Sequence, residues 1–576
     1  MGQPATYREI WCIDFEFHSG GRDGNPPHPV CCVAQELNSL RVIKLWGEEI
    51  RHPPFDLAKT DVLTLAYFAS AESNCMTVLG WRRPSNVLDL YAEFRVLTNG
   101  KRLSQGNGLL GAAAYFGLNT ISMDQKSGMR DLILGGGPFS ESDRRDILEY
   151  CTADVFLTAR LYAAMLPHLT ANWNQALVRG RYMEVVGRVE NRGVPVDDEI
   201  HARLAERWHD IRLKLIEIID QQYGVYIGTT FKSELFERYL ARSGIPWPRL
   251  DSGALCLDES TFKDQARLHP QLKPLKELRS TLGQLRLNSL SIGSDGRNRC
   301  LLSPFSSRTG RNQPSNSRFI FGPSAWIRSL IKPPKGYGLA YCDYARQEFG
   351  IAAALSSDER MSEVYSARDS YIAFAQMAGA VPEGAAKESH PVERGKFKLV
   401  ALAVQYGMTA FGLSNRSGMG LAEARQLLRF HRQAFPGYWQ WSEQVEAFGT
   451  LTRELRTSMG WRIQYPGWNP LNLRSMRNWP IQATGSDMLR LAMIALDQAG
   501  VEVVAPVHDA VLIQCPLENM DEVISETRSI MRRVSAQLLG QIELGVDVDR
   551  TCWPERYVDG RGLQMWNQVL ELAGQP

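Results

Sequence analysis

Two aspartates, far apart in the chain, each stand at the edge of a short apolar run. Asp343 ends YGLAYCD, and Asp509 follows His508 inside VVAPVHDAVLIQC. A buried charge without a partner is costly, so each carboxylate needs one. The runs on both sides of His508 and Asp509 predict two strands joined by a hairpin turn, which brings Asp509 towards Asp343 on a neighbouring strand. Two aspartates on adjacent strand ends are what two-metal nucleotidyl transfer needs.

A second group of acids lies near the N-terminus. Asp14 and Glu16 alternate on the predicted strand EIWCIDFEF, so both side chains point to one face. Tyr150 and Asp154 are four residues apart on a long predicted helix and also share a face. Three acids and a tyrosine that converge on one spot are suited to holding two divalent metals for phosphodiester cleavage.

A basic stripe follows one predicted helix in the second half of the chain. Arg394, Lys398, Leu402 and Tyr406 recur at four-residue spacing in ERGKFKLVALAVQYG and therefore lie along one slowly drifting face. Two cations at one end and Tyr-Gly at the other suit a triphosphate at the cationic end and a base near the tyrosine.

Each of these patterns has a simpler alternative. The Asp14–Glu16 pair can be an exposed strand face. Glu348, five residues after Asp343 and near the start of a predicted helix, can be an N-terminal capping acid. The basic stripe can be a solvated helix face. Their meaning therefore depends on the elements that position them and on their order along the chain.

The chain has 576 residues, 44% of them hydrophobic, and a formal net charge of +2. At about 150 residues per domain this predicts three or four domains. Residues 1–167 alternate strand-like and helical runs, residues 168–290 are helical, and β-type runs return near residue 337 and after residue 480. The near-neutral charge does not by itself indicate a nucleic-acid binder, so any basic surface must be local.

The cysteines and apolar runs indicate where the protein works. Its ten cysteines are scattered and form no CxxC pair, which argues against a zinc site or a disulfide framework. This usage is typical of a reducing compartment, and we expect a cytoplasmic protein. No apolar run approaches the roughly 20 residues of a membrane span, so no membrane partner is expected.

Taken in order, several stretches resemble the family A DNA polymerases, the bacterial polymerase I and T7-like phage group. DFE and YCTAD resemble the Tyr-variant DEDD 3′→5′ proofreading exonucleases, ahead of the polymerase motifs. The polymerase-like stretches are EVVGRVENRGVPVD, SSRTGRNQPSN, DYARQE, RGKFKLVALAVQYG, RNWPIQATGSD and VHDA.

The resemblance implies an α/β and α+β multidomain fold, with an RNase H-like exonuclease domain followed by a right-hand polymerase. The expected divisions are exonuclease 1–167, thumb 168–290, palm 291–360, fingers 361–470 and palm again 471–576. We expect no 5′-nuclease domain ahead of the exonuclease, which is more similar to phage replication enzymes than to a repair polymerase.

The resemblance also implies roles in the palm. Asp343 and Asp509 would hold two Mg²⁺ ions, with Mn²⁺ as a substitute; one metal activates the primer 3′-hydroxyl and the other neutralises the triphosphate. Glu348 would crowd a ribose 2′-hydroxyl and so select deoxynucleotides. His508 would orient the primer terminus.

Further roles concern the incoming dNTP and the primer-template DNA, the two expected partners. Arg394 and Lys398 would hold the triphosphate, and Tyr406 with Gly407 would shape the template-base pocket. The residues expected to contact DNA, chiefly in the minor groove where correct base pairs share acceptors, are Arg311, Arg474, Asn478 and Gln482.

The exonuclease family needs one more acid between its two motifs. We predict Glu72, which follows the strand LTLAYF, and keep Asp89 in VLDLYAEF as the alternative. Glu in place of the usual Asp departs from the family and puts the strength of cleavage in doubt. The predicted exonuclease set is the metal ligands Asp14, Glu16 and Asp154 together with Glu72 and Tyr150.

Two departures from the polymerase family lie at the predicted active site. Leu402 stands where relatives usually have Phe or Tyr beside the incoming sugar, so we expect poor use of dideoxynucleotides. Ala510 stands where relatives usually have Glu, so we expect two aspartates to suffice for metal binding.

Three other functions remain open at this point. A single-subunit RNA polymerase shares the palm motifs, although the exonuclease motif and Glu348 speak against it. A non-catalytic DNA-binding replication scaffold is the second, although both palm aspartates are present. The third is an enzyme whose main activity is exonucleolytic. We expect a monomer that could work with a replisome partner.

Overall fold

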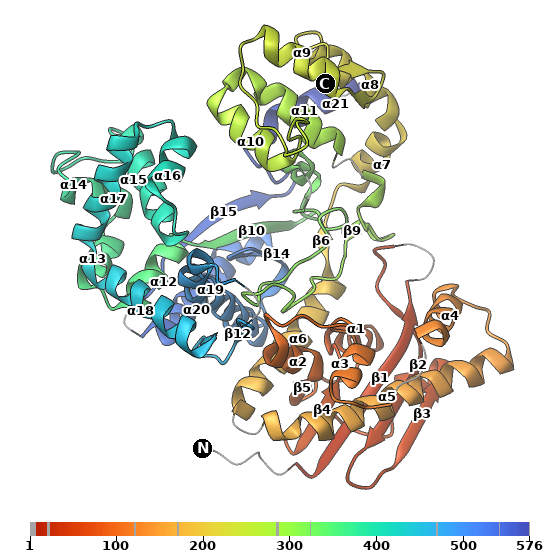
Figure 1. Ribbon diagram of the computed structural model, residues 1–576. Helices are drawn as coiled ribbons and strands as arrows, with labels where there is room; N and C mark the ends of the chain where they lie inside the picture. Colours follow the sequence, from red (N-terminus) through yellow and green to blue (C-terminus); the bar gives the residue numbers. More distant parts are fainter. Residues whose placement is uncertain are drawn as a thin grey trace.

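The computed structural model describes residues 7–19, 23–119, 123–169, 172–283, 287–322, 324–467, 470–540 and 542–574. The two largest β-sheets of these residues are built from strands within residues 9–89 and within residues 337–552, and helices pack between and around them (Figure 1). Within the described residues, no helix has the length and apolar character needed to cross a membrane.

The N-terminal sheet has five strands in the order β3-β2-β1-β4-β5. Strand β1 is central: it pairs antiparallel with β2 and parallel with β4. This mixed arrangement is the kind of sheet expected for an RNase H-like N-terminal domain. The strands are β1 (Glu9–His18), β2 (His28–Glu36), β3 (Val42–Trp46), β4 (Val62–Ala66) and β5 (Asn86–Asp89).

Alternation along β1 separates its two faces. Trp11, Ile13 and Phe15 pack in a core under one face. Cys12 lies on the opposite face, where its thiol donates to the carbonyl of Val155 on helix α5 at 3.4 Å. Asp14 and Glu16 continue the Cys12 face, because side chains two residues apart on a strand point the same way. The helices of this domain are α1 (Ser70–Leu79), α2 (Leu90–Thr98), α3 (Leu109–Tyr115), α4 (Met123–Leu134) and α5 (Glu141–Leu169).

Helix α6 (Trp173–Arg192) joins the N-terminal domain to the rest of the molecule. Its glycines let the backbones touch: a Cβ added at Gly180 would lie 1.9 Å from the Val87 carbonyl oxygen, and one at Gly187 would lie 2.3 Å from that of Ser70. The predicted domain boundary at residue 168 lies shortly before α6. This helix nevertheless packs against elements on both sides of that boundary.

The predicted thumb is a helical group at the top of Figure 1. The C-terminal helix α21 lies with it and packs against α8, although the expected division assigned residues 471–576 to the palm. The helices concerned are α7 (Asp198–Glu206), α8 (Trp208–Asp220), α9 (Ser233–Arg242), α10 (Glu259–Leu268), α11 (Lys273–Gly283) and α21 (Leu563–Leu572).

The palm sheet is antiparallel, with strand order β13-β14-β10-β15. Helix α20 covers one face, where the hydroxyl of Tyr344 donates to the Met531 carbonyl at 2.9 Å. Asp343, the neighbour of Tyr344, lies on the opposite face. The strands and the helix are β10 (Tyr337–Tyr344), β13 (Glu502–Val507), β14 (Ala510–Pro516), β15 (Val546–Cys552) and α20 (Met520–Leu539).

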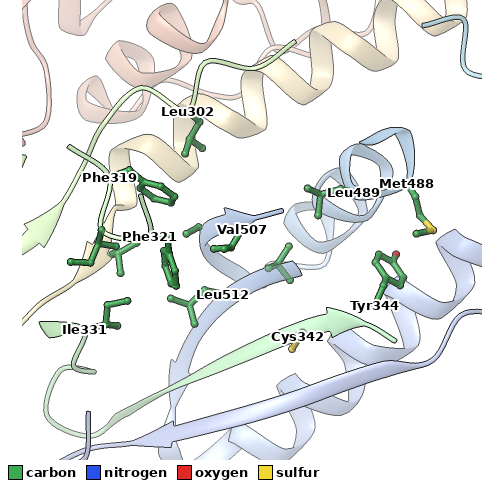
Figure 2. Close-up of a cluster of buried hydrophobic side chains, with 14 of the residues drawn as sticks. Leu302, Phe319, Phe321, Ile331, Cys342, Tyr344, Met488, Leu489, Val507 and Leu512 are labelled. Atoms are coloured by element: carbon green, nitrogen blue, oxygen red, sulfur yellow. The ribbon is translucent and has the colours of Figure 1, made fainter. Parts of the chain in front are cut away.

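A buried apolar cluster fastens the loop before β10 to the palm hairpin (Figure 2). Phe319 and Phe321 from this loop are each 6% exposed and lie near Val507 and Leu512 of the hairpin strands. Burial of an aromatic side chain contributes about 1.5–3 kcal/mol. The loop that carries Arg311 is thereby held against the turn that carries Asp509.

Helices of the predicted fingers, residues 361–470, are drawn in turquoise in Figure 1. They include α13 (Glu359–Ser366), α14 (Ser370–Met377), α15 (Pro391–Gln405), α16 (Ala410–Ser417) and α17 (Leu421–Ala434). Packed between these helices, the palm and the N-terminal domain are α12 (Gln347–Ser356), α18 (Pro436–Thr452), β11 (Glu454–Arg456), β12 (Arg462–Gln464) and α19 (Leu473–Gln498). Of these, α18, β11 and β12 fall within the residues predicted for the fingers.

Candidate active sites

Asp343 and Asp509 meet at one end of the palm sheet. Asp343 pairs with Ala510, the first residue of β14, so it lies next to the turn that precedes this strand. That turn consists of His508 and Asp509 and joins β13 to β14, as the sequence predicted. His508 has φ +56°, a conformation that non-glycine residues seldom adopt, and it lets the turn close within two residues.

The charge around Asp343 favours binding of a cation. Burial, followed by the charges of Asp509, Asp547 and Asp549, raises the pKa of Asp343 to about 6. Like charges held close together repel, and a divalent cation among them removes that repulsion. Carboxylate oxygens are also the ligands that Mg²⁺ prefers, so the residues present fit a magnesium site.

Two side chains, one of them cationic, contact the Asp509 carboxylate in this structure. Arg311 donates from Nη2 to Oδ1 of Asp509 at 2.7 Å. The side-chain amide nitrogen of Gln347, oriented towards the carboxylate, lies 3.0 and 3.1 Å from its two oxygens. Arg311 was predicted to contact DNA; here it pairs with the predicted catalytic carboxylate.

Glu348, Tyr406 and Gln482 form one hydrogen-bonded group. The Tyr406 hydroxyl donates to Oε1 of Glu348 at 2.8 Å, and the amide of Gln482 donates to the same oxygen at 2.5 Å. Glu348 lies in the first turn of α12, Tyr406 caps the end of α15, and Gln482 is on α19. Three separate motifs therefore meet at one carboxylate, close to the Asp343–Asp509 pair.

The cationic part of α15 faces helix α14. Arg394 donates from Nε to Oδ2 of Asp369 at 2.5 Å, and its guanidinium lies 5.4 Å from the centre of the Tyr371 ring. Lys398 lies 5.9 Å from the same ring. The predicted stripe therefore lies on one helix, with its two cations side by side over an aromatic ring.

The other predicted DNA contacts lie on α19. Arg474 is exposed, and its Cβ and Cγ pack so near Gly407 that a Cβ added there would lie 3.0 Å from each. Asn478 is buried, one turn further along, and Leu402 is half-buried, one turn before Tyr406. Gly407 itself has φ +63°, which favours glycine at this bend.

Two acids of the palm were not singled out from the sequence. Asp547 pairs directly with Asp343 across β10 and β15, and Asp549 pairs with Tyr341. Side chains of directly paired residues lie on the same face, so both acids belong to the face that carries Asp343. The alternation of acids in VDVDR indicates that Asp547 and Asp549 share one face of a strand. Only the register of β15 against β10 shows that this face carries Asp343.

The predicted exonuclease acids also converge. Burial and the neighbouring Asp14, which shares a hydrogen bond with Glu72, raise the pKa of the Glu72 carboxyl well above its usual range. Burial and the charges of Asp154, Glu16 and Asp14 raise the pKa of Tyr150. All five predicted residues therefore gather beside β1.

The two candidates for the third acid have different surroundings. Asp89 is fully buried and caps two helices: its oxygens accept from the backbone N–H of Ala92 at 2.6 Å and of Ala69 at 2.5 Å. Glu72 is on α1 and faces Asp14. The geometry favours Glu72 as the acid of the site and assigns Asp89 a capping role.

Cys151 joins this site without having been predicted. Its thiol donates to Oδ2 of Asp14 at 3.4 Å, and ligand atoms of Asp14, Glu16 and Cys151 all lie within 4.8 Å of one another. The cysteine follows Tyr150 directly, and only the packing of α5 on β1 shows that it points to the acids.

A cavity of about 640 Å³ opens beside these acids, between the N-terminal domain and the palm loop. Glu16, Tyr150 and Glu190 line it, as do Arg299 and Arg318 from the loop. Glu190 is 5% exposed; its Oε1 accepts from the Leu302 N–H at 2.6 Å, while its Oε2 has no hydrogen-bond partner within the described residues.

The buried Glu190 carboxyl should make the free energy of unfolding depend on pH. Burial raises its pKa to about 8, so the folded chain favours the neutral acid. This stabilisation is complete below the ordinary pKa near 4.5 and is lost as pH rises through 8. We expect Glu190→Gln to match the wild type at pH 5 and to exceed it at pH 9 by on the order of 4 kcal/mol. Urea unfolding of both proteins at the two pH values measures this, and parallel pH profiles would exclude a neutral Glu190.

Comparison with known proteins agrees with this geometry. Residues 320–552 match the family model for DNA polymerase family A. DNA polymerase I of Deinococcus radiodurans is 26% identical over 391 residues, which cover 63% of this chain and 40% of that protein. The DNA polymerase of Mycobacterium phage D29 is 24% identical over 430 residues, covering 72% of this chain and 68% of that one.

The fold is similar to that of a solved polymerase. The POL domain of Pol1 from M. smegmatis, in complex with DNA primer-template and dNTP, aligns with a TM-score of 0.69 at 18% identity and covers 94% of this chain and 95% of that one. Residues 320–552 thus match DNA polymerase family A, and the similarity to DNA polymerase I of Deinococcus radiodurans extends over 63% of the chain. It spans less than half the length of the bacterial DNA polymerase I relatives from Deinococcus radiodurans and Chloroflexus aurantiacus.

Proposed function

We propose that the protein is a template-dependent DNA polymerase that adds dNTPs to a primer 3′-hydroxyl. The observation that carries this proposal is the convergence of Asp343, Asp509 and the Glu348 group on one face of the palm. The partners are then primer-template DNA and dNTPs, the molecules bound in the M. smegmatis structure. A phage-like replicative role is supported by the similarity to the D29 polymerase.

Asp343 and Asp509 would hold two divalent ions, most simply Mg²⁺. When bound, such ions supply activation of the primer 3′-hydroxyl and neutralisation of the triphosphate. The remaining work falls to residues of the chain. Arg311 and Gln347 contact Asp509 and keep its carboxylate oriented.

Arg394 and Lys398 would bind the triphosphate. In this structure the Arg394 guanidinium is paired with the Asp369 carboxylate. An incoming triphosphate must therefore displace that carboxylate or bind the guanidinium beside it. The exchange replaces one carboxylate by a group with more negative charge, which favours the nucleotide. Lys398 adds a second cation on the same side of the Tyr371 ring.

Glu348 would select the sugar. The Tyr406 and Gln482 hydrogen bonds fix its carboxylate, so it cannot swing away from a ribose 2′-hydroxyl. Extension of one primer with dNTPs and with rNTPs tests this function: strong preference for dNTPs supports a DNA polymerase. Equal or better use of rNTPs would favour the single-subunit RNA polymerase instead.

We also propose a 3′→5′ proofreading activity for the N-terminal domain. Asp14, Glu16, Glu72, Tyr150 and Asp154 gather beside the cavity described above, whose palm wall carries Arg299 and Arg318. Asp14, Glu16 and Asp154 are the proposed metal ligands. Arginines facing the acids suit a negatively charged strand that enters from the polymerase side.

The leucine at position 402 should make the protein a poor user of dideoxynucleotides. Leu402 is half-buried and provides no ring next to the incoming sugar. We expect the wild type to incorporate ddNTPs at least about tenfold less well than dNTPs, and Leu402→Tyr to narrow the gap by about tenfold. Single-nucleotide incorporation with matched dNTP and ddNTP pairs gives the ratio directly. A wild-type ratio near one contradicts the prediction.

Replacing Ala510 with glutamate should change the rate of primer extension only modestly. Ala510 is fully buried and pairs with Asp343, while Asp547 pairs with Asp343 from the other side and already adds a carboxylate. We expect Ala510→Glu to change the extension rate by less than about tenfold in either direction. Steady-state extension in Mg²⁺ and in Mn²⁺ measures it. A gain of a hundredfold would mean that the acid absent from position 510 is a core catalytic group.

A further inference from the structure

A second cavity, of about 620 Å³, lies at the seam between the N-terminal domain and the segment that connects α18 to α19. Its walls come from residues 101–115 and 452–467, and we call it the seam cavity. It shares no lining residue with the cavity beside the exonuclease acids. Nothing in the proposed mechanism uses it.

The seam is rigidly joined, so the cavity is preformed. The backbone N–H of Gln464 donates to the Asn99 carbonyl at 2.9 Å, and Arg462 donates from Nε to the Val96 carbonyl at 2.8 Å. The backbones approach so closely at Gly100 that a Cβ there would lie 2.0 Å from the Gln464 carbonyl oxygen. The two walls of the cavity are therefore held together by hydrogen bonds and close backbone contact.

The walls carry an excess of positive charge. Lys101, Arg102 and Arg453 all line the cavity. Arg453 has φ +56° at the end of α18, a position that usually takes glycine. An arginine side chain at this position therefore costs backbone strain. Glu454, the one carboxylate among the described lining residues, is already paired with Arg456 and Arg462.

Aromatic and apolar groups alternate with these cations. Tyr115 is 45% exposed, and its hydroxyl accepts from Nζ of Lys101 at 3.0 Å. Tyr465 is half-buried, and its buried hydroxyl has no hydrogen-bond partner within the described residues. Phe448, 56% exposed, lies one turn before Thr452, which lines the cavity, and so extends an apolar surface to its edge.

We propose that the seam cavity binds unpaired single-stranded DNA, namely the template strand ahead of the primer terminus. A cationic groove tracks a phosphate backbone and exposed rings stack bases, a combination typical of sequence-independent single-strand binding. The cavity wall ends at Gly467, and the chain from there to Arg474, beside Gly407, spans at most about 25 Å. The inference rests on the proposed polymerase function, because only that function supplies an unpaired template here.

The test compares primer-templates with two and with ten unpaired template nucleotides. Binding is measured by fluorescence anisotropy without divalent metal, which prevents turnover. We expect the wild type to bind the long overhang at least about fivefold more tightly, and the triple variant Lys101→Gln, Arg102→Gln, Arg453→Gly to lose that advantage. Glycine at position 453 keeps the left-handed conformation, so the fold is retained. The salt dependence of long-overhang binding should also fall, by about two counterions.

A matched control removes three arginines elsewhere, by Arg528→Gln, Arg532→Gln and Arg533→Gln on the exposed side of α20. This control should keep the overhang advantage. Equal affinity of the wild type for both overhangs, or an equal loss in the control, would overturn the inference. Extension of the two-nucleotide template by the wild type is measured in parallel. Its absence would reject the polymerase function, whereas extension without an overhang advantage would reject the seam site alone.

Discussion

Asp509→Asn should reduce primer extension by at least about a thousandfold, equivalent to about 4 kcal/mol of transition-state stabilisation. The substitution keeps the shape of the side chain and an oxygen that can accept from Arg311, so the hairpin should stay folded. It removes one of the two charges that we assign to metal binding at the end of the palm sheet. Rapid-quench extension of a labelled primer measures the loss.

Primer-template affinity separates catalysis from binding in this variant. We expect Asp509→Asn to bind DNA within about threefold of the wild type, because the substitution removes negative charge and leaves Arg311. Asp521→Asn serves as the matched control, since its side chain is 85% exposed on α20. A thousandfold loss in that control as well, or normal extension by Asp509→Asn, would remove the basis for a catalytic Asp509.

Glu72→Gln should abolish most 3′→5′ cleavage, with a loss of at least about a hundredfold, while extension stays within about twofold. Glu72 is 4% exposed and shares a hydrogen bond with Asp14, so the amide keeps the packing and removes the carboxylate. Degradation of a labelled single-stranded oligonucleotide measures cleavage. Extension by the same preparation reports on the palm.

Asp89→Asn distinguishes the two candidate acids. Asp89 accepts hydrogen bonds from Ala69 and Ala92, and its amide counterpart loses part of this double cap. We expect a loss of stability of about 1 kcal/mol rather than a selective loss of cleavage. If Asp89→Asn destroyed cleavage at unchanged stability while Glu72→Gln cleaved normally, Asp89 would be the third acid.

Local sequence patterns predicted the elements that carry the palm aspartates. YGLAYCDY predicted a strand, and β10 spans Tyr337–Tyr344. The apolar runs around His508 and Asp509 predicted a hairpin, because such runs bury their side chains only as paired strands. The four-residue spacing from Arg394 to Tyr406 predicted one helical face, and α15 ends at Gln405. These features depend on neighbours in the sequence.

Features that depend on packing could not be predicted in the same way. Asp547 reaches Asp343 only through the register of β15, and Arg394 meets Asp369 only where α14 packs on α15. Strand β2, His28–Glu36, lacks a clear alternation because it is buried on both faces beside β1. The position of Cys151 likewise depends on how α5 lies on the sheet.

One experiment tests most directly whether this chain copies a template. A primer is offered each dNTP singly on four templates that differ only in the first unpaired base, with Mg²⁺ present and with Glu72→Gln included to suppress cleavage. The palm geometry predicts that the complementary dNTP extends each primer at least about a hundredfold faster than the others, and that this preference changes with the template base. Absence of extension, or the same dNTP preference on all four templates, would contradict a template-dependent DNA polymerase.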